Sequence, residues 1–152
     1  MTLRVFYIAK ASGGAVAQLE AHYQKMISAF GRIELIPIFN KTLEKAQKAG
    51  REAARAAYTQ ALAPHLAGAF CVAMDERGKT PDSPGFAKLI DVDRPVHLMI
   101  GGAYGLEESF VGRCDAAVSL SRMTLSHELA RLVLLEQCYR ALSILNSHPY
   151  HK

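Results

Sequence analysis

Short apolar runs alternate along the chain with longer segments in which apolar residues recur every three or four positions. Runs of the first kind predict buried strands, and the second periodicity predicts helices with one apolar stripe. We expect five strands, at Leu3–Ala9, Ile33–Phe39, Ala69–Met74, Val96–Ile100 and Ala116–Leu120. We expect five helices between and after them, at Ala15–Phe30, Thr42–Leu62, Phe86–Val92, Ser109–Cys114 and Ser126–Leu145.

The alternation of strands and helices requires crossover connections, which predict an α/β fold with a mostly parallel sheet and helices on both faces. Pro37 places the second strand near an edge, because proline cannot donate a ladder hydrogen bond. In such sheets ligands bind beyond the carboxyl ends of the strands. Three predicted loops leave those ends and are expected to face one pocket: the polar segment Asp75–Lys79, Gly101–Gly105 and Ser121–Thr124.

The composition is that of one globular domain, expected to span residues 1–152. Hydrophobic residues make up 50% of the chain and charged residues 21%. These proportions exclude a disordered chain. The net charge of +4 suits a polyanionic partner without requiring one. Three scattered cysteines indicate reduced thiols and not a disulfide framework. No signal segment and no membrane span are recognised, so a cytoplasmic location is expected.

The segment Gly-Gly-Ala-Tyr-Gly at 101–105 is the first candidate for ligand binding, because glycines let a backbone approach a ligand closely. It matches neither a phosphate-binding loop nor a dinucleotide fingerprint, and an ordinary tight turn explains it equally well. Asp75 could hold a ribose hydroxyl or an amine, although a solvated turn is the favoured alternative. His148 and His151 alone make a weak metal site, so no metal is expected.

The last predicted helix carries an apolar band that wraps most of Leu129–Leu145, so it is buried on more than one side. The second side faces either a partner subunit or the rest of this chain. Glu136 and Arg140 have the spacing of a local ion pair. Arg131 interrupts the band, with Glu128 three residues before it. The chain closes on His-Pro-Tyr-His-Lys, which is either a frayed end or a group that meets a ligand.

Three segments together resemble one known family: IGGAYGL at 100–106, SLSRMTLSHELARLVLLEQCYRA at 119–141 and the closing HPYHK. They are similar to the ribosomal large-subunit methyltransferase H family, SPOUT enzymes that methylate N3 of a pseudouridine in large-subunit (23S) ribosomal RNA. The resemblance implies a C-terminal deep trefoil knot, S-adenosylmethionine as cofactor, a homodimer, and the ribosome as partner. Carried onto this sequence, it implies that the cofactor is lined by Met74, Gly102, Ser121, Arg122, Met123, Thr124 and Leu125.

The implied reaction moves a methyl group from a sulfonium to an imide nitrogen, so it needs alignment and a nitrogen lone pair. The polar residues predicted near the target base are Arg131, Arg140, Tyr150 and His151. Arg140 would give electrostatic support, His151 would accept a proton and Tyr150 would stack on the base. Two alternatives stay open: a SPOUT methyltransferase that acts on another RNA, and a ribosome-binding factor that has kept the fold without catalysis.

Overall fold

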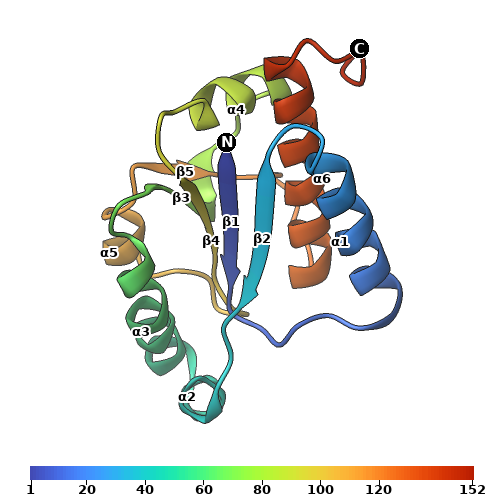
Figure 1. Ribbon diagram of the computed structural model, residues 1–152. Coiled ribbons are helices and arrows are strands. Elements are labelled where there is room, and N and C mark those ends of the chain that lie inside the picture. The colour runs from blue at the N-terminus through green and yellow to red at the C-terminus, as the bar shows by residue number, and fades with distance from the viewer.

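The computed structural model describes residues 1–152 as a five-stranded sheet with helices on both faces (Figure 1). The strands are β1 (Thr2–Tyr7), β2 (Arg32–Pro37), β3 (Phe70–Lys79), β4 (Val96–Ile100) and β5 (Ala116–Val118). The helices are α1 (Gly14–Ile27), α2 (Lys41–Ala49), α3 (Arg51–Leu62), the 3₁₀ turn η1 (Ala63–His65), α4 (Ser83–Ile90), α5 (Glu108–Val111) and α6 (His127–Leu145). The predicted alternation of strands and helices is confirmed.

The sheet has the strand order β2-β1-β4-β3-β5, and every neighbouring pair is parallel. The prediction of a parallel α/β sheet is therefore confirmed. β2 is an edge strand and ends at Pro37, where a missing N–H costs no central hydrogen bond. All five residues of β4 are buried, as its continuous apolar run predicts for a strand covered on both faces.

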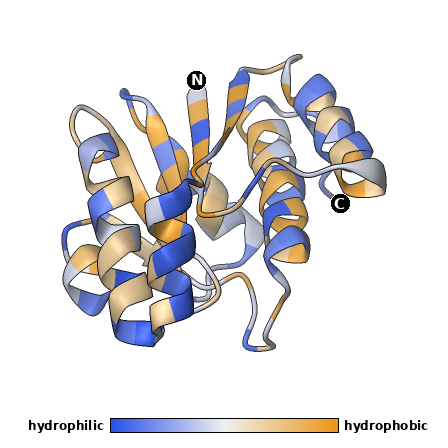
Figure 2. Cartoon of the chain, turned by 90° about the horizontal axis from the view of Figure 1, so that it is seen from below, coloured by the Kyte–Doolittle hydropathy of each residue, from blue (hydrophilic) through white to orange (hydrophobic).

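The two faces of the sheet carry separate hydrophobic cores. Helices α1, α4 and α6 cover one face, where Ile27, Ile90 and Leu134 belong to a cluster of 19 buried residues. Helices α2, α3 and α5 cover the other, where Tyr58 and Phe110 belong to a cluster of 12. Apolar and polar stripes alternate along the helices in Figure 2, as expected for elements with one buried side.

The single helix expected over Thr42–Leu62 is wrong, because the chain forms two helices here. α2 ends at Ala49 and α3 begins at Arg51, and the glycine between them has φ 127° and ψ −178°. Side-chain-bearing residues rarely adopt such a backbone, whereas glycine reaches it at little cost. The alanine-rich sequence favours helix on both sides of Gly50, and it conceals this sharp change of direction.

The polar loop expected over Asp75–Lys79 is also wrong, because β3 continues through Lys79. After a register shift Lys79 pairs with Val118, and the Ser119 amide donates to the Lys79 carbonyl at 2.8 Å. A Cβ built at Gly78 would lie 2.6 Å from the carbonyl carbon of Ala117. The polar side chains conceal a strand whose backbone passes in close contact with β5.

α6 is a central helix of the monomer, packed against both α1 and α4. Leu134, Leu135 and Cys138 are fully buried, so the core of one chain accounts for much of the apolar band. Leu129, near the start of the helix, remains 54% exposed. No helix in the chain combines the length and apolar character needed to cross a membrane.

Candidate functional site

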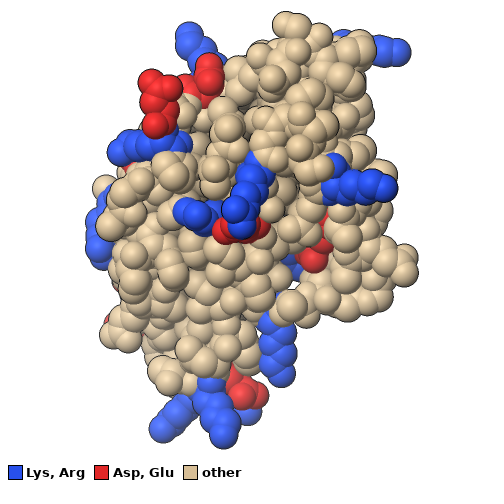
Figure 3. All heavy atoms as spheres, viewed as in Figure 1, with Lys and Arg blue, Asp and Glu red and all other residues tan.

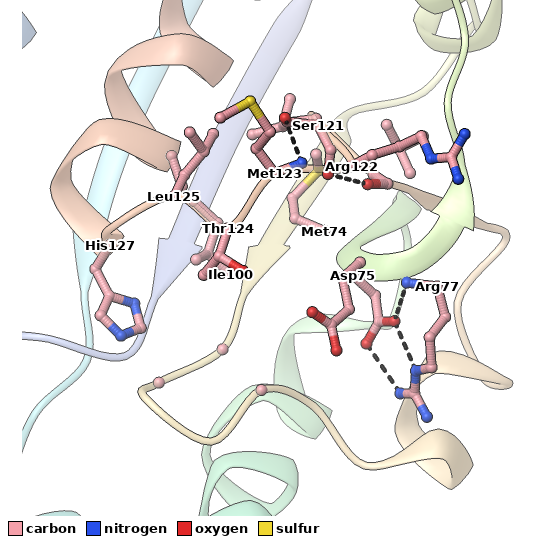
Figure 4. A pocket seen from close by; sticks show the side chains of 18 residues that line it. Met74, Asp75, Arg77, Ile100, Ser121, Arg122, Met123, Thr124, Leu125 and His127 are labelled. Atoms are coloured by element: carbon pink, nitrogen blue, oxygen red, sulfur yellow. Dashed lines mark hydrogen bonds and ion pairs between the residues drawn. The ribbon is translucent and has the colours of Figure 1, made fainter.

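A pocket of about 490 Å³ lies at the carboxyl edge of the sheet (Figure 4). Its wall comes from the second half of β3, the loop after β4, the segment after β5 and the start of α6. The predicted convergence of three segments at this edge is confirmed. The lining residues are Met74, Asp75, Glu76, Arg77, Ile100, Gly101, Gly102, Gly105, Val118, Ser119, Leu120, Ser121, Arg122, Met123, Thr124, Leu125, His127 and Ala130.

All seven residues predicted to line a cofactor lie in this wall: Met74, Gly102, Ser121, Arg122, Met123, Thr124 and Leu125. The segment after β5 is shaped by its own serines. The Ser119 hydroxyl donates to the Ser121 carbonyl at 2.9 Å, and the Ser121 hydroxyl accepts from the Met123 amide at 2.9 Å. Met123 is 79% exposed and stands at the rim.

The glycine loop after β4 needs its glycines for two different reasons. The Gly105 amide donates to the Gly102 carbonyl at 3.0 Å, and Gly105 has φ 73°, which closes a tight turn. At Gly102 φ is not positive, but a Cβ would lie 2.4 Å from the ring of Tyr58. The loop is thus a close-packed backbone surface that faces the pocket.

Asp75 places its carboxylate in the pocket wall, and its side chain is only 6% exposed. Arg77 grips it with two hydrogen bonds, from Nε to Oδ1 at 2.9 Å and from Nη2 to Oδ2 at 3.0 Å (Figure 4). These bonds from Arg77 hold the pKa of Asp75 below its usual value, despite the opposing effect of burial. Asp75 is therefore a buried, ionised hydrogen-bond acceptor and not part of a solvated turn.

His127 lines the pocket from the first turn of α6, a position that the sequence interpretation did not single out. The Ser126 hydroxyl caps this helix by accepting from the Leu129 amide at 3.4 Å. Burial, reinforced by the charge of Arg131, holds the pKa of His127 below its usual value. A neutral imidazole therefore faces the pocket at neutral pH. The sequence feature that could have pointed to His127 is its place directly after the helix-capping Ser126.

Three of the four residues predicted to act on the base meet at the other end of α6. Arg140 Nη1 lies 3.4 Å from His151 Nδ1, and the Arg140 guanidinium lies 4.7 Å from the centre of the Tyr150 ring. The Tyr150 hydroxyl donates to Glu136 Oε1 at 3.1 Å, and Arg140 donates to the same carboxylate. Burial and then this bond to Glu136 raise the pKa of Tyr150.

Glu136, Arg140, Tyr150 and His151 together form the tail cluster. The sequence predicted Glu136 only as a local ion-pair partner of Arg140, and that pair is present. The structure adds that Glu136 also holds the tail through the Tyr150 hydroxyl. The Tyr150 ring packs edge-on against Tyr139, with centroids 4.6 Å apart. The end of the chain is therefore folded onto α6 and is not frayed.

Arg131 joins neither the pocket wall nor the tail cluster. It is 1% exposed, and its guanidinium lies 4.1 Å above the ring of Tyr7. Its ion pair is with Glu20 of α1, and it also donates to the Ser12 hydroxyl. Glu128, the acid three residues before it, is not its partner. These contacts tie α6 to α1 and to the loop before α1.

The pocket lies at the start of α6 and the tail cluster at its end. Figure 1 shows the C-terminal segment beside that end of the helix. His127 and Arg140 are separated by about 20 Å along α6, given a helical rise of about 1.5 Å per residue. Within one chain, the residues predicted to line the cofactor therefore lie together, and three of those predicted to act on the base lie together. The two groups do not meet. The charged side chains seen in Figure 3 form small, separated groups of both signs.

The fold and the pocket define an α/β domain that can hold a small molecule at the carboxyl edge of a parallel sheet. A family model described as "Predicted SPOUT methyltransferase" matches residues 1–151, and the chain belongs to this SPOUT methyltransferase family.

Curated relatives match along the whole chain. "Ribosomal RNA large subunit methyltransferase H" of Wolinella succinogenes is 42% identical, with all of this chain and all of that protein covered. The protein of the same name from Aliarcobacter butzleri is 40% identical, again over all of both chains. A crystal structure of a candidate RNA methyltransferase from Bacillus anthracis shares the fold, with a TM-score of 0.53 and 10% identity, over 99% of this chain and 97% of that one.

The pocket also fits a cofactor of the size of S-adenosylmethionine. Its volume of about 490 Å³ falls within the range of about 300 to 1,000 Å³ usual for small-molecule sites. Gly101 and Gly102 line it with backbone alone, and the Asp75 carboxylate offers an acceptor in the wall. The donor and acceptor set matches a ligand that carries amino and hydroxyl groups.

Proposed function

We propose that this protein is an S-adenosylmethionine-dependent methyltransferase that methylates N3 of a pseudouridine in large-subunit (23S) ribosomal RNA. The observation that carries the proposal is one pocket assembled from all three predicted segments and lined by all seven predicted residues. Further support comes from the relatives at 42% and 40% identity, which are named as large-subunit rRNA methyltransferases and match over their full length.

The pocket residues would hold the cofactor. Gly102 and the segment 121–125 line it, and Asp75 offers a carboxylate held ionised by Arg77. When bound, the cofactor supplies an electrophilic methyl group on a sulfonium. Its surroundings need only orient the two partners and exclude water, because this methyl group is already activated. Leu125 and Met74 supply apolar wall for that purpose.

The tail cluster acts on the base. The Arg140 guanidinium stabilises the anionic form of the imide, which makes N3 nucleophilic. A ring nitrogen of His151, which lies beside the Arg140 guanidinium, takes the N3 proton. The Tyr150 ring offers an aromatic face for stacking. Glu136 fixes Arg140 and the Tyr150 hydroxyl together, so the cluster is preorganised.

The active protein is a homodimer in which the tail cluster of one subunit meets the pocket of the other. This arrangement is supported by the span of about 20 Å that separates the two halves along α6 in one chain. Apolar side chains near the pocket end of α6 support it too, since Leu129 is 54% and Met123 79% exposed. A two-fold dimer then holds two equivalent composite sites. Residues 1–152 act as one domain, in the cytoplasm, where ribosomes are found.

We also propose that the C-terminal part of the chain forms the deep trefoil knot of SPOUT proteins. The close contact of Gly78 with the backbone of Ala117 and Val118 supports this, because two segments far apart in the sequence pass there without room for a Cβ. A knot would place all three pocket segments in one tightly crossed region. It would also explain why a polar stretch such as 75–79 is kept as strand.

The function is tested by incubating the purified protein with S-adenosylmethionine and ribosomes from a strain that lacks the gene. Nucleosides from the ribosomal RNA are then analysed by mass spectrometry. One added methyl group on pseudouridine N3 is the expected product. Methylation of a different RNA instead would support the first alternative, and ribosome binding without methyl transfer would support the second. Either outcome would contradict the proposal.

A further inference from the structure

Helix α3 lies directly behind the glycine loop of the pocket. Tyr58 of α3 is 0% exposed, and a Cβ at Gly102 would lie 2.4 Å from both its Cζ and its Oη. The ring is held in place, because Gln47 of α2 donates from Nε2 to the Tyr58 hydroxyl at 2.9 Å. Gly102 is thus required by the close approach of this ring and not by its backbone angle.

The other end of the loop is fastened by the same helix. Arg55 of α3 donates from Nη2 to the Leu106 carbonyl, and Arg77 donates to the same oxygen at 3.4 Å. Leu106 is itself 1% exposed, so its backbone has little freedom to move. The loop from Gly101 to Leu106 is therefore held at both ends by side chains of α3, one aromatic and one cationic.

We infer that Tyr58 and Arg55 are positioning residues that set the shape of the Gly101–Leu106 loop and, through it, the affinity for S-adenosylmethionine. This inference rests on the proposed function. Neither residue lines the pocket, so each acts only through the loop. A loop fixed in its bound shape loses little conformational entropy on binding, which raises affinity without any added contact.

A double-mutant cycle on Gly102 and Tyr58 tests the inference, with the affinity for S-adenosylhomocysteine measured by calorimetry. Gly102→Ala should weaken binding by about tenfold or more, because the new methyl group meets the ring and shifts the loop. Tyr58→Leu alone should weaken it by about threefold, since it only loosens the loop. The pair Tyr58→Leu with Gly102→Ala should bind as Tyr58→Leu does. The pair Tyr58→Phe with Gly102→Ala should not recover, because Cζ stays in place.

Two further variants keep the result independent of folding. Gly112→Ala is the matched glycine control, because its Cβ would meet nothing closer than 3.5 Å, and it should bind normally. Arg55→Gln lies on a partly exposed side chain and should weaken binding by about three- to tenfold, with an unchanged melting temperature. Normal affinity in Gly102→Ala, or a double variant as weak as the product of the single ones, would overturn the inference.

A ligand-free measurement separates this inference from the proposed function. If the wild-type protein does not bind S-adenosylhomocysteine, the proposed function fails. The loop can then still be examined by amide hydrogen exchange over residues 101–106 in the free protein. Tyr58→Leu should speed exchange there by about tenfold, whereas Gly112→Ala should not. Unchanged exchange in Tyr58→Leu would overturn the role of Tyr58 whatever the ligand.

Discussion

The two ends of α6 are built in different ways. At its start the chain forms a pocket, where the loop at Gly102 and the serine-bonded segment after β5 leave an open space. At its end it forms the tail cluster, a compact network of side chains around Glu136 that lines none of the larger pockets. One end is suited to hold a small molecule and the other to act on a base, and neither is a complete site.

The largest effect is expected from removal of Tyr150, His151 and Lys152. A chain that ends at Pro149 should lose methyl transfer to ribosomes by about 10³-fold, equivalent to about 4 kcal/mol of transition-state stabilisation. His148 stays, and with it the contact to Phe30. Calorimetry and light scattering should show unchanged S-adenosylhomocysteine affinity and an unchanged dimer. Full activity in the shortened chain would remove the tail cluster from the mechanism.

Arg131 sharpens the comparison, because it lies between the two ends and was predicted to act on the base. Arg131→Leu leaves the buried carboxylate of Glu20 without its ion-pair partner and with only the Ser12 hydroxyl as donor, so the free energy of unfolding should fall by about 3 kcal/mol. Adding Glu20→Leu should restore most of it, as urea unfolding can measure. If the double variant regains methyl transfer together with stability, Arg131 has a structural role in joining α6 to α1. Activity that stays lost in the stable double variant supports the catalytic role.

Arg140 tests how much of the tail cluster depends on guanidinium geometry. Arg140→Lys keeps the charge but loses the fork that contacts Glu136 through two nitrogens, so kcat should fall by about 10- to 100-fold. The affinity for S-adenosylhomocysteine should not change, because Arg140 does not line the pocket of its own chain and its proposed role is on the base. Arg113→Lys, at an exposed site, is the matched control and should behave as wild type. A loss of affinity in Arg140→Lys would contradict the division of roles in which the tail cluster acts on the base and not on the cofactor.

The smallest expected effect concerns pH and the pocket end. Burial, with the charge of Arg131, lowers the pKa of His127, so below neutrality the unfolded chain binds more protons than the native one. Stability from this group should therefore be full above about pH 6.5, the unfolded value, and decline as pH falls toward the native value. Urea unfolding at several pH values should show a shallower decline in His127→Gln. An unchanged decline would contradict the assigned protonation.

The fold could be predicted well from the sequence where the hydrophobic pattern is continuous. It was predicted poorly where a single residue or a backbone pairing determines the local structure. All five strands were expected, yet Gly50 breaks a helix whose composition favours continuation. The segment 75–79 was expected to be a loop because its side chains are polar, although backbone pairing with β5 makes it strand. Local propensity predicts neither the helix break at Gly50 nor the strand over 75–79, because both depend on the path of the chain in three dimensions.

The candidate site shows the same division. The seven pocket residues could be named because the family resemblance covers them and parallel strands bring their ends together. The partner of Arg131 could not be named, since Glu20 is 111 residues away along the chain. The ring of Tyr58 behind Gly102 was equally invisible in the sequence. Both features depend on contacts between segments that are far apart in the sequence. The separation of the pocket and the tail cluster along α6 likewise became visible only in the structure.

The central claim, that each site joins the pocket of one subunit to the tail cluster of the other, is tested most directly by mixing two defective chains. One chain ends at Pro149 and keeps its pocket, and the other carries Gly102→Ala and keeps its tail. The cofactor is supplied at a concentration that fills the wild-type pocket but not the altered one. After subunits are exchanged at equal amounts, half of the dimers are mixed and each holds one intact composite site, so methyl transfer should return to about one quarter of the wild-type rate. If both halves of the site belonged to one subunit, the mixture would stay as inactive as its components.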